Sequence, residues 1–105
     1  MAWALLFVAG LFEIAWAIGL KYSEGMTRLV PALFTLVGMV FSFLFLAQAL
    51  KTIPVGTGYA VWTGIGAAGT AILGIVLFSE SAAWPRLISL ALIIAGMIGL
   101  KLTSP

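Results

Sequence analysis

Charged residues divide this chain into four long apolar runs, and the length of those runs is the strongest constraint on its fold. A helix needs about 20 apolar residues to cross the hydrocarbon core of a bilayer, because each residue adds about 1.5 Å. We therefore expect an all-α integral membrane protein with one four-helix transmembrane domain over residues 1–105. The first run is not expected to be a cleavable signal, since it has no basic leader and Glu13 interrupts it. The expected spans are residues 2–20, 29–50, 56–78 and 85–101.

The composition supports residence in a membrane and excludes several classes of function. Only 8% of the residues are charged, whereas about a quarter are charged in a typical soluble domain. The chain has no histidine and no cysteine, which excludes zinc and haem ligation, disulfides, and Ser–His or Cys–His catalysis. We expect no metal, no cofactor and no enzymatic activity. Nucleic acid is not an expected partner either, because the five cations are scattered singly between apolar runs.

The loops carry a balanced positive charge. Four spans place both termini and the second loop on one side, together with Lys51 and Lys101. The first and third loops carry Lys21, Arg28 and Arg86 on the other side. The terminal amine makes the two sides nearly equal, so the positive-inside rule gives no preferred orientation. We expect dual topology, with an antiparallel homodimer as its natural product. The alternative is that one tie-breaking charge or a partner fixes a single orientation.

Glu13 lies near the middle of the first expected span. An ionisable group at that depth costs a few kcal/mol or more on insertion scales. One interpretation is a permanently protonated acid that forms a structural hydrogen bond between helices. The interpretation we favour is a carboxylate that exchanges a proton for a cation, because ionisable residues within membranes are generally functional.

Residues three and four positions from Glu13 share its helix face, and they are Ala9, Gly10, Trp16 and Ala17. Gly10 and the alanines are expected to leave space or admit another backbone. Trp16 offers an indole N–H that can donate to the carboxylate, although it can also serve packing alone.

The second span carries a stripe of small residues, Thr35, Gly38 and Ser42, at spacings that place them on one helix face. Ser42 is the expected hydrogen-bond donor near mid-membrane. Thr35 and Gly38 are expected to allow close helix approach.

The third span carries Tyr59 and Trp62, whose face continues through Gly66 and Gly69. A phenol and an indole supply two donors and two π faces that suit a cation. The alternative for Tyr59 is the aromatic belt at the membrane surface. The run Gly64-Ile65-Gly66 is expected to weaken the helix and act as a conformational hinge.

The fourth span shows small residues at helical spacing and no polar group on that face. Small residues at this spacing let two helices touch along their backbones. We therefore expect the dimer contact at Ala91, Ala95, Gly96 and Gly99.

Several segments together resemble the small multidrug resistance transporters, and the resemblance extends over essentially the whole chain. The pattern of a mid-helix glutamate, Tyr-x-x-Trp and Gly-x-Gly is highly specific. The segments are Gly10-Leu-Phe-Glu13-Ile-Ala-Trp16, Gly19-Leu-Lys21-Tyr-Ser-Glu-Gly25 with Arg28, Pro54-Val-Gly-Thr-Gly-Tyr59-Ala-Val-Trp62-Thr-Gly-Ile-Gly66, and Gly96-Met-Ile-Gly99-Leu-Lys101.

This resemblance implies a multi-pass protein of the bacterial cell membrane that works as a dual-topology, antiparallel dimer and exchanges protons for cations. Glu13 from each subunit is then the shared proton and substrate carboxylate. Tyr59 and Trp62 line the pocket, and Gly64 to Gly66 form the bend that interchanges the two protomer shapes. Gly10 and Trp16 resemble the guanidinium-exporter branch of the family.

In that branch, Ser42, Trp16 and Trp62 are expected to hydrogen-bond and order the glutamates. The sequence therefore predicts a proton-coupled antiporter that exports guanidinium and small monosubstituted guanidinyl cations. Its expected partners are those cations, protons, the lipid bilayer and a second copy of the chain. The alternatives are a broad quaternary-ammonium exporter of the same family, and a small dual-topology channel or non-transporting membrane subunit.

Overall fold

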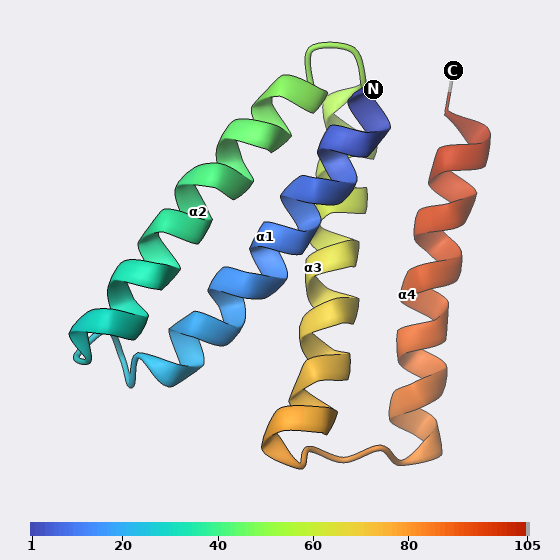
Figure 1. Cartoon of the computed structure of the whole chain (residues 1–105). Helices are drawn as coiled ribbons and strands as arrows, with labels where there is room; N and C mark the ends of the chain where they lie inside the picture. Colours follow the sequence, from blue (N-terminus) through green and yellow to red (C-terminus); the bar gives the residue numbers. More distant parts are fainter. Residues whose placement is uncertain (105) are drawn as a thin grey trace.

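The structure is a computed structural model that describes residues 1–104, and it consists of four helices joined by short connections (Figure 1). All four helices are long and apolar enough to cross a membrane. A multi-pass membrane protein is thereby supported, as the sequence predicted. The helices are α1 (Ala2–Tyr22), α2 (Leu29–Ala49), α3 (Val55–Phe78) and α4 (Trp84–Thr103).

The fourth helix is longer than its uncharged stretch of sequence. It begins at Trp84 and reaches Thr103, with Pro85 in its first turn. Proline is tolerated there because the first N–H groups of a helix have no intrahelical acceptor. Arg86 and Lys101 therefore lie within the ends of α4. Their long side chains allow the charges to reach the membrane surface.

The helix ends form two groups, which we call the terminal end and the loop end. The terminal end holds the N terminus, the α2–α3 connection and the C-terminal end of α4, whereas the loop end holds the α1–α2 and α3–α4 connections (Figure 1). The ammonium of Lys101 lies 5.0 Å from the ring centroid of Trp3 at the terminal end. That of Lys21 lies 6.0 Å from the ring centroid of Phe78 at the loop end. The cations are therefore divided between the two ends as the topology argument assumed.

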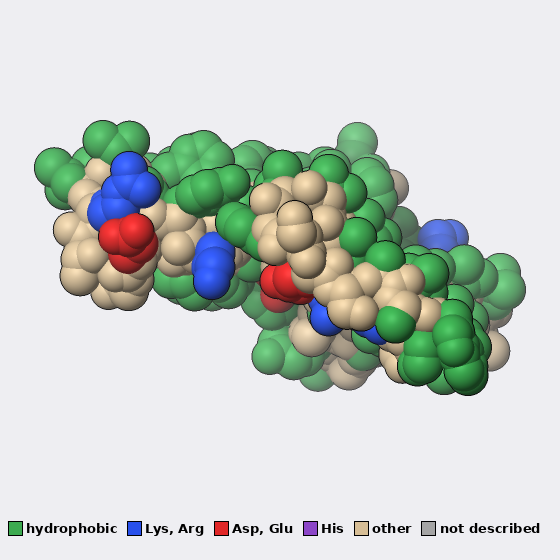
Figure 2. All heavy atoms as spheres, turned by 90° about the horizontal axis from the view of Figure 1, so that it is seen from below, with side chains coloured by type: hydrophobic (Ala, Val, Ile, Leu, Met, Phe, Trp, Pro, Cys, Tyr) green, Lys and Arg blue, Asp and Glu red, His purple; other side chains and the backbone are tan. Residues whose placement is uncertain are grey.

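Charges of both signs occur at the loop end, where they form separate groups among backbone and apolar side chains (Figure 2). Arg86 forms an ion pair with Glu80, and the Nη2–Oε1 distance is 2.7 Å. The α1–α2 connection is ordered by Ser23, which is fully buried. Its hydroxyl donates to the carbonyl of Leu20 and accepts from the N–H of Met26. Short, internally bonded connections of this kind hold neighbouring helices in fixed register.

Helix α1 lies between α2 and α3, while the backbone of α4 approaches closely only that of α3. The main core lies toward the terminal end, and its buried residues are Leu6, Ala9, Leu46, Ala49, Ile53, Val61 and Trp62. Leu90 is the only buried residue of α4. Most of the large apolar side chains elsewhere are exposed on the single chain, which is what lipid or a second protein surface would cover.

The small residues of α2 bring α1 close. Thr35, Gly38 and Ser42 are all buried, and a Cβ added to Gly38 would lie 3.0 Å from the Cβ of Trp16. A Cβ on Gly19 of α1 would lie 2.7 Å from the Thr35 hydroxyl oxygen. The expected role of Thr35 and Gly38 in close helix approach is confirmed.

Replacing Gly38 with alanine should therefore push α1 and α2 apart. We expect Gly38→Ala to lower the free energy of unfolding by about 1–3 kcal/mol, the usual cost of overpacking. Gly56→Ala is the matched control, since nothing lies within 4 Å of its added Cβ and alanine favours the helix. Unfolding in mixed micelles, followed by circular dichroism, measures both. Equal effects of the two substitutions would contradict the close packing at Gly38.

Candidate functional site

The carboxyl group of Glu13 lies against the backbone of Gly66 on α3. A Cβ added to Gly66 would overlap the Glu13 side chain, so only glycine leaves room for this contact. Glu13 is partly buried, and its Oε1 is buried without a hydrogen-bond partner within residues 1–104. An unpaired buried oxygen is costly. A proton on the carboxyl group removes this cost, whereas a donor from outside the protomer reaches Oε1 only after a local movement.

Ser42 joins α1, α2 and α3 through two buried hydrogen bonds. Its hydroxyl donates to the carbonyl of Ala9 over 2.8 Å. The same oxygen accepts the indole N–H of Trp62 over 3.0 Å. Because the three helices meet at one hydroxyl, their depths in the membrane are fixed relative to one another.

These bonds differ from the direct hydrogen bonds to Glu13 that the family resemblance implied for Ser42, Trp16 and Trp62. In the protomer, Ser42 and Trp62 satisfy each other. The indole nitrogen of Trp16 is buried and has no partner among the described residues. The physical reason is the rotation of α2, which directs Ser42 toward the Ala9 carbonyl, one turn before Glu13.

Gly10 was expected to leave space or to admit another backbone, and in the structure it allows close approach of a side chain of α3. The position that its Cβ would take is occupied by the side chain of Ile65, whose Cβ would lie 2.7 Å away. Gly10 thus accommodates a branched side chain of α3. The close approach of α1 to α3 at this point brings Glu13 and Gly66 together.

The two hydrogen bonds of Ser42, which we call the serine bridge, are followed by aromatic rings that extend toward an open face of the protomer. The ring centroids of Tyr59 and Trp62 are 5.5 Å apart, and those of Phe43 and Trp62 are 5.8 Å apart. Phe43 also packs edge-on against Trp16 at 6.4 Å. Tyr59 is 56% exposed, so its phenol faces outward from the single chain and is available to a ligand or to a second subunit.

The glycines expected to act as a hinge are contact points in an unbroken helix. Helix α3 is continuous from Val55 to Phe78. A Cβ on Gly64 would overlap Met97 of α4, while Gly66 faces Glu13 of α1. A bend at these glycines would therefore displace α4 and the carboxylate together.

The residues expected at the dimer contact lie apart from this site, on the exposed side of α4. Ala91, Ala95 and Gly96 are exposed and Gly99 is partly exposed. No atom of residues 1–104 lies within 4 Å of a Cβ added to Gly96 or Gly99. The protomer thus leaves this stripe uncovered.

Thr70 is a candidate site residue that the sequence interpretation missed. Its hydroxyl oxygen is buried without a partner among the described residues. It follows Gly66 by four positions and so shares the helix face that carries Tyr59 and Trp62. Extending that face by one further turn in the sequence would have identified it.

Comparison with known proteins adds an independent finding. The family described as Small Multidrug Resistance protein matches residues 1–93. A protein from Yersinia pseudotuberculosis serotype I named Guanidinium exporter is 64% identical over 104 residues, which cover 99% of this chain and 100% of that protein. Proteins of the same name from Proteus vulgaris and Citrobacter freundii are 59% and 58% identical. These alignments also span 99% of this chain, and they cover 100% and 99% of the respective relatives.

Removing the Ser42 hydroxyl should destabilise the protomer, because Ser42→Ala leaves the Trp62 indole N–H without its acceptor. We expect the free energy of unfolding to fall by about 1–3 kcal/mol, the cost of leaving a buried polar group unpaired. Mixed-micelle unfolding monitored by tryptophan fluorescence measures this. Ser89→Ala is the matched control, since its hydroxyl is exposed and bonded only within its own helix. A loss as large in the control would contradict the bridging role of Ser42.

Proposed function

Because the chain belongs to the small multidrug resistance family, we propose that it exports guanidinium and small monosubstituted guanidinyl cations in exchange for protons. The proposed process is transport across the cell membrane without covalent chemistry. The names of the full-length relatives support the substrate. The position of the Glu13 carboxyl group within α1 supports the coupling of proton and cation transport.

The observation that carries the proposal is a buried carboxyl oxygen of Glu13 in α1 that has no hydrogen-bond partner within residues 1–104. The other two acidic residues, Glu24 and Glu80, lie outside the helices, so Glu13 is the one acid in a membrane-spanning segment. A proton or a cation can satisfy its oxygen, and binding of either displaces the other. Competition for one group is sufficient to couple the two fluxes.

Guanidinium suits such a site because it is planar, permanently charged and rich in N–H donors. Paired carboxylates can each accept two N–H groups in the fork arrangement. Each protomer supplies one Glu13, so we propose that an antiparallel homodimer brings two of them together. The exposed phenol of Tyr59 would complete the surroundings of the substrate, together with the buried N–H of Trp16, which has no partner among the described residues.

The transport cycle follows from the equivalence of the two subunits. Protomers of two shapes would exchange those shapes and present the site to opposite sides of the membrane. The proposed bend lies at Gly64-Ile65-Gly66, where α3 contacts Met97 on one side and Glu13 on the other. Movement at this point would couple the position of α4 to that of the carboxylate.

A broad quaternary-ammonium exporter is the second candidate, favoured by the rings of Phe43, Trp62 and Tyr59. Such cations have no N–H and rely on aromatic faces. Competition between guanidinium and a tetraalkylammonium for transport into liposomes distinguishes the two. Current without saturable proton-coupled exchange would indicate the channel alternative.

Neutralising Glu13 tests the function directly. We expect guanidinium to release protons from the detergent-solubilised wild-type protein and to be exchanged for protons in liposomes. Glu13→Gln should abolish both signals, because the amide can neither release a proton nor pair with a cation. A pH indicator in weakly buffered solution measures the release.

Glu24→Gln serves as the matched control, since Glu24 is an exposed glutamate in the α1–α2 connection. It should release protons as the wild type does. Guanidinium binding that persists in Glu13→Gln would rule out the proposed role of the carboxylate.

The stripe of small residues on α4, which contains Gly96 and Gly99, provides a test of the proposed homodimer. We expect Gly99→Leu to raise the dimer dissociation constant by about tenfold, because added bulk separates helices that pack on small residues. The protomer itself has room for the leucine, as nothing lies within 4 Å of the added Cβ. Energy transfer between labelled protomers in micelles measures the constant.

Gly56→Leu makes the same change at an exposed position of α3 where nothing among the described residues lies within 4 Å of the added Cβ, and it should leave the constant unchanged. An unchanged constant in Gly99→Leu would place the dimer contact elsewhere.

A further inference from the structure

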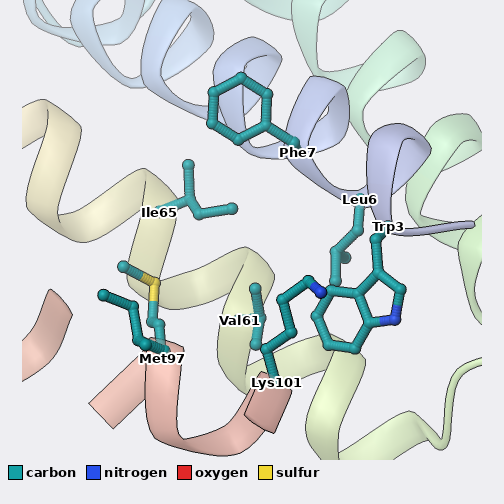
Figure 3. Close-up of a pocket in the computed structure, with 8 residues that line it drawn as sticks. Trp3, Leu6, Phe7, Val61, Ile65, Met97 and Lys101 are labelled. Carbon is teal, nitrogen blue, oxygen red and sulfur yellow. The ribbon is translucent and has the colours of Figure 1, made fainter. Parts of the chain in front are cut away.

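A second concave feature lies outside the site described above, in the groove between α1, α3 and α4. It is a cavity of about 260 Å³ near the terminal end (Figure 3). Helices α1 and α4 form its two sides and α3 forms its floor. Its lining consists of Trp3, Leu6, Phe7, Val61, Ile65, Met97, Ile98 and Lys101.

The chemistry of this groove differs from that of the Glu13 site. Its walls are apolar side chains, and the charged group among them is the Lys101 ammonium, which lies 5.0 Å from the Trp3 ring centroid. Lys101 forms no ion pair within residues 1–104. Since the lining contains no acidic residue and already holds a cation, the groove is unsuited to guanidinium.

The groove also faces away from the proposed translocation surface. Successive residues of a helix are about 100° apart, so Val61 and Ile65 lie about 200° and about 240° around α3 from Tyr59. Gly66 and Thr70 lie within about 20° of Tyr59 on the same scale. The groove therefore opens toward the surroundings of the protomer on the side opposite Tyr59.

We propose that this groove binds an anionic phospholipid. The apolar walls formed by Phe7, Ile65 and Met97 would hold part of an acyl chain, and the Lys101 ammonium would donate to the phosphate of the headgroup. Lys101 lies in the last turn of α4 and Trp3 in the first turn of α1, which are the depths at which headgroups meet a membrane protein. Basic pockets between transmembrane helices recognise anionic lipids by this combination of contacts.

The proposal rests on the groove alone and does not require transport or dimerisation. If the protein forms the antiparallel homodimer proposed above, the grooves of the two subunits lie in opposite leaflets. Each leaflet would then supply one lipid. An effect of lipid on α4 would reach Gly64 directly, because Met97 lines the groove and contacts that glycine.

Native mass spectrometry of the full chain in detergent tests the proposal. Phosphatidylglycerol and phosphatidylcholine with the same acyl chains are added separately, and retained lipid is counted. We expect preferential retention of phosphatidylglycerol by the wild type. Lys101→Gln should reduce that retention about fivefold, the equivalent of about 1 kcal/mol for one basic residue at an anionic surface. Lys101→Arg should preserve it, since the charge remains.

Two controls separate this site from general charge and bulk effects. Lys51→Gln removes a cation from the same end outside the groove and should leave retention unchanged. Ile98→Trp fills the groove and should reduce retention with Lys101 intact. Ile94→Trp makes the same change one turn earlier on α4, outside the lining, and should not.

Four results would overturn the proposal. The first is equal retention of the two lipids by the wild type, and the second is equal phosphatidylglycerol retention by wild type and Lys101→Gln. The third is displacement of the lipid by an equal concentration of glycerol phosphate, which would assign the site to a soluble anion. An Ile98→Trp variant that changes only the dimer dissociation constant would assign the groove to a second copy and would also contradict the proposal.

Discussion

The contact between the Glu13 carboxyl group and the backbone of Gly66 is the constraint on which the rest of the site depends. A carboxyl group in a membrane-spanning helix must either hold a proton or meet a counter-ion. Here one of its oxygens is buried and unpaired within residues 1–104, so the protomer leaves the choice open. In the proposed exchange, the carboxyl group binds a proton and a cation in turn. The absence of a Cβ at Gly66 leaves room for that carboxyl group against α3.

The serine bridge gives this carboxylate a defined position. Ser42 bonds to the Ala9 carbonyl and receives the Trp62 indole N–H, which joins the three helices that surround the site. Most other contacts between these helices are apolar packing contacts. A buried hydrogen-bond pair of this kind selects one register, because any shift leaves two polar groups without partners.

Helix α4 is attached more loosely and offers two further surfaces. Its stripe of small residues is uncovered in the protomer, and we propose that the fourth helix of a second copy packs there. Its other side closes the groove that ends at Lys101 and Trp3, which is proposed to receive a lipid. The groove is connected to α3 through Met97, which contacts Gly64. The helix with the fewest internal contacts is therefore the one suited to respond to the surroundings.

The sequence by itself determined that the chain forms four membrane-spanning helices, that its cations are shared between two sides, and that Glu13 is the one acid within them. These properties depend on length, hydropathy and order along the chain, which are local. The tertiary structure decided that Ser42 bonds Ala9 and Trp62, that Ile65 fills the space beside Gly10, and that Thr70 joins the site face. Such contacts depend on the rotation and depth of each helix relative to its neighbours. Apolar periodicity restricts those quantities only weakly when lipid and protein are equally apolar.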